Sequence, residues 1–212
     1  VSIIDRAEID KMQYTDLAEA LAYMPGTHRV SIGGIGHQTS MFIRGSNSNH
    51  SLTLIDGIEM GDPSASSGAF DFGNIFIGMV DRIEVLRGSQ ASTYGSEAIG
   101  GVINISTRNN TSNNSTIIGI RSGPDNHIKK YIQGNIASEK SSFSLGLLDS
   151  NTNGFPSLMN STLDQGYENN SVISELNHNN KYLDISLSTW SSEGKVEYLI
   201  FESPVSQNYK NE

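Results

Sequence analysis

The residues with the clearest chemical potential form a glycine-rich run that ends in a histidine, Ile32-Gly33-Gly34-Ile35-Gly36-His37. Closely spaced glycines let a backbone approach a phosphate group, but a dinucleotide-binding loop also follows a strand and opens a helix. No strong strand pattern precedes this run and no helix pattern follows it, so the sequence favours a tightly curved loop. His37 is either a ligand-contacting side chain or an ordinary loop histidine, and the sequence favours the second.

The sequence gives little support for catalysis, metal binding or nucleic-acid binding. No Ser, His and Asp residues fall in a known catalytic spacing, so we expect no catalytic residues and no enzyme. The chain has 0 Cys, which removes thiolate metal sites and cysteine nucleophiles. His37 has no neighbouring partner for a transition metal, so we expect no metal and no cofactor. Lys and Arg are not clustered and the net charge is −9, which argues against nucleic acid as a partner.

Composition favours strands with one polar face. Hydrophobic residues make up 36% and charged residues 17% of the 212 residues, so much of the polarity comes from Ser, Asn, Thr and Gly. No run of about 18 apolar residues exists, which excludes a transmembrane helix from the sequence given.

The first half predicts short helices and β-branched strands. Asp5 to Glu8 has the form of a capping box that opens a helix through Met12. A second helix follows a cap at Thr15 or Asp16 and ends at Pro25-Gly26. Strands are expected at residues 2–4, 41–44, 52–55, 82–86 and 102–106. A small-residue loop at residues 61–70 is too long for a tight turn, and such loops are commonly functional or disordered.

After a polar linker at residues 108–114, the pattern changes to period two. Six strands are expected, around residues 118–120, 128–136, 143–147, 172–176, 183–187 and 196–200. Short turns at 138–141 and 178–181 alternate with a long loop at 149–169. Short turns on one rim and long loops on the other are typical of an outer-membrane barrel, although the pattern alone fits a soluble β-sandwich equally well.

Four motifs together resemble a known family. They are Met41-Phe42-Ile43-Arg44-Gly45, Leu54-Ile55-Asp56-Gly57, Val80-Asp81-Arg82-Ile83-Glu84-Val85-Leu86-Arg87-Gly88 and Tyr94-Gly95-Ser96-Glu97-Ala98-Ile99-Gly100-Gly101-Val102-Ile103-Asn104-Ile105. In this order they are similar to the plug domain of TonB-dependent outer-membrane receptors. Within that family, the segment 44–57, with its Asn-rich loop ending in His50, is most similar to the receptors for cobalamin.

The resemblance implies an α+β plug domain at residues 1–109, with a small mixed sheet and short helices. Residues 110–212 would then be the N-terminal antiparallel β-strands of an incomplete transmembrane β-barrel, which has 22 strands in plugged transporters. We therefore expect the chain to be a fragment. It would start after the signal peptide and the box that contacts TonB, and end about a quarter of the way round the barrel.

The resemblance also implies roles for individual residues. Arg44 and Arg87 match positions that pair with glutamates on the barrel wall and hold the plug. The ligand-binding positions correspond to His37, Gln38, Thr39, Ala65, Ser66 and Ser67, whose chemistry suits neutral hydrogen bonding to the amide groups of a large ligand. Cobalamin receptors also carry a calcium-binding aspartate cluster in a long loop. The corresponding residues 151–170 hold Asp164 and Glu168, but Leu163 and Gln165 stand where carboxylates would be needed, so no calcium site is expected.

The function implied is that of a transporter in the outer membrane of a Gram-negative bacterium. It would bind a scarce, bulky extracellular nutrient, cobalamin or another corrinoid, and import it with energy from the TonB complex. A siderophore or haem receptor of the same family is the alternative. A β-rich surface adhesin is the alternative from another class, but it leaves the Arg-Gly and Gly-Gly motifs unexplained.

Overall fold

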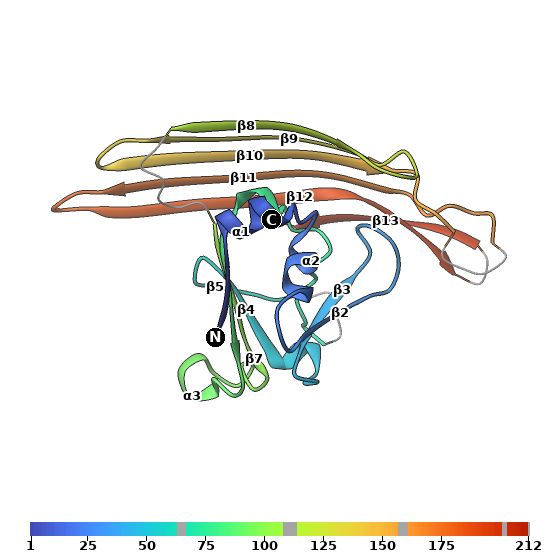
Figure 1. Ribbon diagram of the computed structural model, residues 1–212, viewed down its shortest axis with the longest axis horizontal. Helices are drawn as coiled ribbons and strands as arrows, with labels where there is room; N and C mark the ends of the chain where they lie inside the picture. Colours follow the sequence, from blue (N-terminus) through green and yellow to red (C-terminus); the bar gives the residue numbers. More distant parts are fainter. Residues whose placement is uncertain (63–66, 108–113, 157–160, 201–202, 212) are drawn as a thin grey trace. The chain divides into compact units, whose positions relative to one another are not determined.

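The computed structural model describes residues 1–62, 67–107, 114–156, 161–200 and 203–211. The chain divides into two compact units (Figure 1). One comprises Val1–Ile32 and Gln38–Thr107, and the other comprises Gly33–His37 and Arg108–Glu212. The short glycine-rich segment thus groups with the second half of the chain. The domain boundary expected between residues 109 and 110 lies outside the described residues.

The first unit is built on a mixed five-stranded sheet with the order β1-β6-β7-β4-β5. Its strands are β1 (Ser2–Asp5), β4 (Ser51–Ile55), β5 (Ile58–Met60), β6 (Val80–Arg87) and β7 (Gly101–Thr107). The β4 and β7 strands run parallel, whereas the other neighbours are antiparallel. Alternate residues Ile83, Val85, Ile103 and Ile105 are buried, so the central strands carry the core of this unit.

A separate two-stranded ladder joins β2 (Thr27–Ser31) to β3 (Thr39–Ile43) on either side of the glycine-rich run. The expectation that no strong strand precedes this run is wrong, because β2 ends at Ser31. The β2 strand has no buried residue, so it lacks the apolar alternation that reveals a strand. The expectation that no helix follows the run is confirmed, because β3 comes next.

Two short helices begin at the caps expected from the sequence. Asp5 caps α1 (Arg6–Met12), and its Oδ1 accepts the Glu8 N–H at 2.9 Å. Asp16 caps α2 (Leu17–Ala22), and its Oδ1 accepts the Glu19 N–H at 2.6 Å. Shorter helical turns are η1 (Ser48–His50), η2 (Ile77–Met79) and α3 (Ala91–Tyr94). No helix among the described residues is long and apolar enough to cross a membrane.

The second unit contains an antiparallel sheet in which each strand pairs with the next along the chain (Figure 1). Its strands are β8 (Ser115–Ser122), β9 (Ile128–Ala137), β10 (Ser141–Thr152), β11 (Tyr167–Asn179), β12 (Asp184–Ile200) and β13 (Ser203–Asn211). The segments at 183–187 and 196–200 were expected to be two strands, but both belong to β12. The polar residues between them, including Ser191 and Ser192, hide this continuity in the sequence.

The two faces of this sheet have reversed polarity compared with a sheet that covers an apolar core. One face exposes large apolar side chains, including Ile118, Ile132, Ile136, Phe143, Leu147, Val172, Leu176 and Leu187. The other face buries polar side chains, including Gln133, Asn135, Ser144, Asn169, Ser171, Glu175 and Ser192. The buried polar groups bond to one another, since Ser171 and Ser192 both donate to Asn169 Oδ1 at 3.0 and 2.9 Å.

Replacing the cap of α2 tests how this helix is held. Asp16→Ala removes the acceptor for the Glu19 N–H and should lower the free energy of opening of α2 by about 1 kcal/mol, or about fivefold in the opening equilibrium. Native-state amide hydrogen exchange of residues 19–22 measures this change. Asp16→Asn is the matched control, because an asparagine oxygen can make the same bond. Equal exchange rates in both variants would contradict the role of the cap.

Candidate functional site

His37 lies inside the second unit and is almost fully buried, with 1% of its surface exposed. Its ring meets Tyr198 edge-on, with centroids 4.8 Å apart and planes at 80°. Its Nε2 lies 3.1 Å from the backbone oxygen of Glu197. Because a carbonyl oxygen only accepts, Nε2 is the protonated nitrogen and donates this bond.

The glycines before His37 allow close contact with aromatic rings. A Cβ on Gly36 would lie 2.0 Å from ring carbons of Tyr167, and Gly36 has a φ of +78°, which disfavours other residues. A Cβ on Gly34 would lie 3.2 Å from Phe155. The motif that resembled a phosphate loop therefore serves packing: it lets the backbone lie flat on side chains of the second unit.

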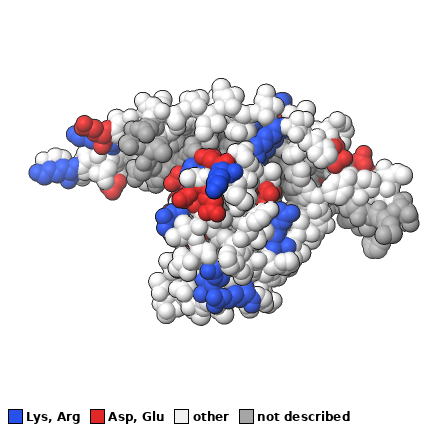
Figure 2. All heavy atoms as spheres, viewed as in Figure 1, with Lys and Arg blue, Asp and Glu red and all other residues white. Residues whose placement is uncertain are grey.

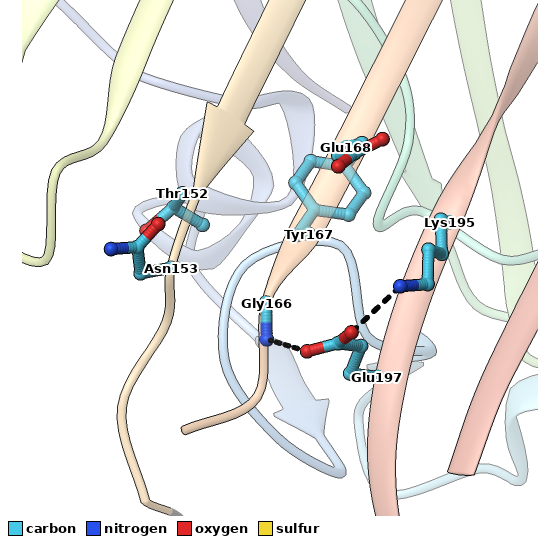
Figure 3. A pocket seen from close by; sticks show the side chains of 7 residues that line it. All are labelled: Thr152, Asn153, Gly166, Tyr167, Glu168, Lys195 and Glu197. Carbon is cyan, nitrogen blue, oxygen red and sulfur yellow. Dashed lines mark hydrogen bonds and ion pairs between the residues drawn. The ribbon is translucent and has the colours of Figure 1, made fainter. Parts of the chain in front are cut away.

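Glu197 is the point at which several parts of this unit meet. Its backbone N–H donates to Gly166 O at 3.0 Å, and its Oε2 accepts the Gly166 N–H at 3.1 Å. Its Oε1 accepts from Lys195 Nζ at 2.8 Å (Figure 3). Since its carbonyl also accepts from His37, this one residue connects β12, the end of the loop before β11, and the glycine-rich segment.

A cavity of about 280 Å³ lies beside this junction. It is lined by Thr152, Asn153, Gly166, Tyr167, Glu168, Lys195 and Glu197 (Figure 3). These residues come from the ends of β10 and β11 and from β12, at the base of the loop that spans residues 153–166. Its lining is mainly polar and offers hydrogen-bond donors, acceptors, one ammonium and two carboxylates.

The sheet register assigns the side chains of this site to opposite faces. Glu168 pairs directly with Lys195, and by alternation both share the face that carries Val172 and Leu187. Tyr167 and Tyr198 belong to the buried face, on which His37 packs. The sequence analysis identified 196–200 as strand but missed Lys195 and Glu197. Their opposite charges two residues apart on a strand were the available signal.

The other ligand-binding candidates that the structure describes belong to the first unit. Gln38 is exposed and Thr39 is 5% exposed, and both belong to the first unit. Ser67 is exposed, whereas Ala65 and Ser66 lie outside the described residues. The assignment of these six residues to a ligand site stays a prediction.

Thr39 is held by a half-buried carboxylate in the first unit. Asp71 Oδ1 accepts the backbone N–H groups of Thr39 and Gly73 at 2.8 and 2.9 Å. Burial raises the pKa of Asp71, and the two N–H donors only partly offset this effect. The folded unit therefore favours the neutral acid over the carboxylate, relative to the unfolded chain.

The two predicted fastening arginines lie close together in the first unit. A Cβ on Gly26 would lie 3.3 Å from Arg87 Cδ and 3.5 Å from Arg44 Cγ. Arg87 donates to Ser2 Oγ and to Pro25 O, both at 2.7 Å, whereas Arg44 is exposed. Figure 2 shows Lys and Arg side chains gathered at the lower end of this unit. Their pairing with wall glutamates stays a prediction.

The absence of a calcium site from the long loop stays a prediction. Between residues 153 and 166 the sequence has one acidic residue, Asp164, and its side chain is exposed. The described part of the chain holds no group of three or more His, Cys, Asp or Glu side chains placed for a metal. Hard cations need several converging oxygens, and the nearby Glu197 already accepts from Lys195 and Gly166.

Solved structures share this fold. The siderophore receptor PirA from Acinetobacter baumannii matches with a TM-score of 0.71 at 21% identity, over 93% of this chain and 32% of its own. The ferric citrate transporter FecA matches with a TM-score of 0.72 at 19% identity, over 92% of this chain and 31% of its own. The chain therefore shares the fold of these proteins over about a third of their length.

Sequence comparison is more specific. Residues 1–102 match the family model described as the TonB-dependent Receptor Plug Domain. The vitamin B12 transporter BtuB of Photobacterium profundum is 32% identical over 204 residues, and that of Vibrio vulnificus is 36% identical over 124 residues. These stretches cover 93% and 58% of this chain. The chain belongs to the TonB-dependent receptors of the Gram-negative outer membrane and is similar to the BtuB branch.

The chain spans only 33% and 20% of the length of these two relatives. The relatives and structural neighbours are transporters and receptors.

The raised pKa of Asp71 predicts a pH dependence. As pH rises from the unfolded pKa through the higher folded pKa, the folded state loses its preference for protons and the first unit loses stability. Asp71→Asn keeps an acceptor oxygen but does not titrate. At pH values above the folded pKa of Asp71, this variant should therefore be more stable than the wild type, and the stability of its first unit should depend less on pH.

Hydrogen exchange of residues 39–43 in the full-length receptor between about pH 4 and pH 7 measures this effect, after correction for the intrinsic exchange rate. Glu59→Gln, which removes an exposed charge in the same unit, is the control. If the corrected exchange rates of Asp71→Asn changed with pH as steeply as those of the wild type, Asp71 would not be the group whose pKa is raised by folding.

The Glu197 junction predicts how the long loop is anchored. Glu197→Ala removes the acceptor for Lys195 and for the Gly166 N–H, and we expect proteolysis between residues 153 and 166 to become about tenfold faster. Glu197→Gln retains one side-chain oxygen, so its rate of proteolysis should lie between the rates of the wild type and of Glu197→Ala. Limited proteolysis of the full-length receptor in detergent measures the rates, and unchanged cleavage in the alanine variant would show that the loop is held elsewhere.

Proposed function

We propose that this chain is the plug-containing part of a transporter that imports cobalamin or another corrinoid across the outer membrane. The observation that carries the proposal is the similarity to BtuB, which extends over both halves of the chain at 32% identity. Structural similarity at about 20% identity supports the fold but does not select a ligand. Because the chain spans a third of its relative's length, the activity belongs to a longer protein.

The reversed polarity of the second unit supports a place in the membrane. Exposed Ile136, Phe143 and Leu187 suit contact with lipid, and the buried polar face suits the interior of a plugged barrel. In the proposed arrangement, residues 1–109 form the plug and residues 110–212 form the first strands of the wall. The TonB complex of the inner membrane would supply energy to displace the plug, and the ligand would cross without chemical change.

The ligand face that we propose is polar and uncharged. Gln38 and Ser67 are exposed, and with Ser66 and the backbone of Ala65 they would offer hydrogen bonds to the amide groups of a corrinoid. Ferric siderophores carry strong negative charge, and these residues provide no cation to receive it. A siderophore or haem ligand is therefore the second outcome that the experiment must distinguish. His37 is buried in the second unit, so we assign it a different role below.

Uptake by cells that express the full-length gene tests the proposal. We expect import of labelled cyanocobalamin that depends on TonB, with no import of ferric enterobactin. The double variant Gln38→Trp with Ser66→Trp should reduce uptake at least about tenfold, because two indole rings fill the ligand face. Tyr182→Trp, at an exposed turn far along the chain, is the matched control. Undiminished uptake in the double variant would contradict the ligand face, and import of the siderophore alone would contradict the ligand.

A further inference from the structure

We propose that Gly33–His37 is a latch: a closed loop that is held on the second unit through His37 and Gly36, and that must detach during each transport cycle. This inference rests on the proposed function, since it assumes that the first unit moves during import. It gives the glycine-rich motif a mechanical role and makes His37 a positioning residue, one that acts through Glu197 and not on the ligand.

The first step is the quality of the attachment. The His37 ring is enclosed by protein, packs edge-on against Tyr198, and donates from Nε2 to Glu197 O at 3.1 Å. Aromatic pairs favour the edge-on arrangement, and hydrogen bonds weaken steeply as their angle departs from linear. The attachment is therefore specific, and displacement of the segment weakens both contacts.

The second step is the close approach of the backbone. Gly36 lies on the ring of Tyr167, and a Cβ there would come within 2.0 Å of two ring carbons. Tyr167 is itself 4% exposed, so it cannot swing aside without leaving its own packing. As long as Tyr167 is present, the segment therefore fits its seat only with glycine at position 36.

The third step is the short tether. Ile32 and Gln38 flank the segment and belong to the first unit, and the Ile32 N–H donates to Gln38 O at 3.2 Å. The His37 N–H donates to Gly34 O at 3.3 Å, which folds the loop back on itself. Because the base of this loop is closed, it cannot lengthen to follow a moving first unit. Any such movement must either open the base or free His37 from Glu197.

Glu197 connects the latch to the long loop and to the cavity. Glu197 also holds the end of the long loop through Gly166 and lines the cavity with Lys195. A change at the loop or the cavity therefore acts on the strand segment whose carbonyl receives His37. The seat of the latch and the base of the long loop share one residue, so displacement of either loosens the other.

A reversible crosslink tests whether the latch must open. The chain has 0 Cys, so Gly36→Cys with Tyr167→Cys introduces a unique pair into a full-length receptor cleared of other cysteines. The ideal Cβ at Gly36 lies 2.7 Å from Tyr167 Cγ, one bond from the Tyr167 Cβ, which is compatible with the roughly 3.5–4.5 Å that separates the Cβ atoms of a disulfide. Oxidation would close the latch, and reduction would release it.

We expect the oxidised variant to bind cyanocobalamin with a Kd within about threefold of its reduced form, while uptake falls at least about tenfold and returns on reduction. Leu147→Cys with Val172→Cys is the matched control. These residues are cross-strand partners on the exposed face of β10 and β11, so their crosslink should leave uptake unchanged.

Uptake at the same rate before and after complete oxidation would overturn the latch, and so would a loss of binding that accounts for the whole loss of uptake. The wild type separates these results from the proposed function. A wild-type receptor that binds and imports cyanocobalamin supports that function even where the crosslink has no effect. A wild type that neither binds nor imports it overturns the function and the latch that rests on it.

Discussion

The reversed polarity of the six-stranded sheet is the constraint on which the rest of the structure depends. Exposed Ile118 and Leu187 on one face would be costly in water, because each leaves a large apolar surface unburied. Buried Asn169 and Glu175 on the other face would be costly in an apolar core unless they were bonded. The hydrogen bonds of Ser171 and Ser192 to Asn169 offset the cost on the polar face. The two faces together suit a sheet that has an apolar medium on one side and a polar interior on the other.

The buried polar face also determines what can attach to it. The backbone of Gly33–His37 brings peptide groups and a histidine, which can bond with exposed carbonyls such as Glu197 O. An apolar side chain on this segment would gain little there. Glycine allows direct contact with Tyr167, and the result is a contact made mainly by backbone and rings. Such a contact is specific in position but small in area, which is compatible with repeated release.

The first unit follows ordinary rules of packing. Leu21, Ile83 and Ile103 are fully buried, and caps at Asp5 and Asp16 hold the helices to their start points. Its unusual features lie at the surface, where Gly26 leaves room for Arg44 and Arg87 to lie side by side. Arg87 is held there by hydrogen bonds to Ser2 Oγ and Pro25 O, whereas Arg44 is exposed.

The sequence by itself determined the helix caps, four of the five strands of the mixed sheet (all but β5), the period-two pattern of the second half and the motifs of the plug family. These features are local, because capping, alternation and turn glycines depend on neighbours in the chain. Only the tertiary structure decided that 183–187 and 196–200 form one strand, since that depends on pairing with β11 over its whole length. It also decided that His37 is buried against Tyr198 and that Lys195 and Glu197 meet at the Gly166 junction. Contacts between residues 160 positions apart in the chain leave no periodic signal, because they depend on how distant segments pack.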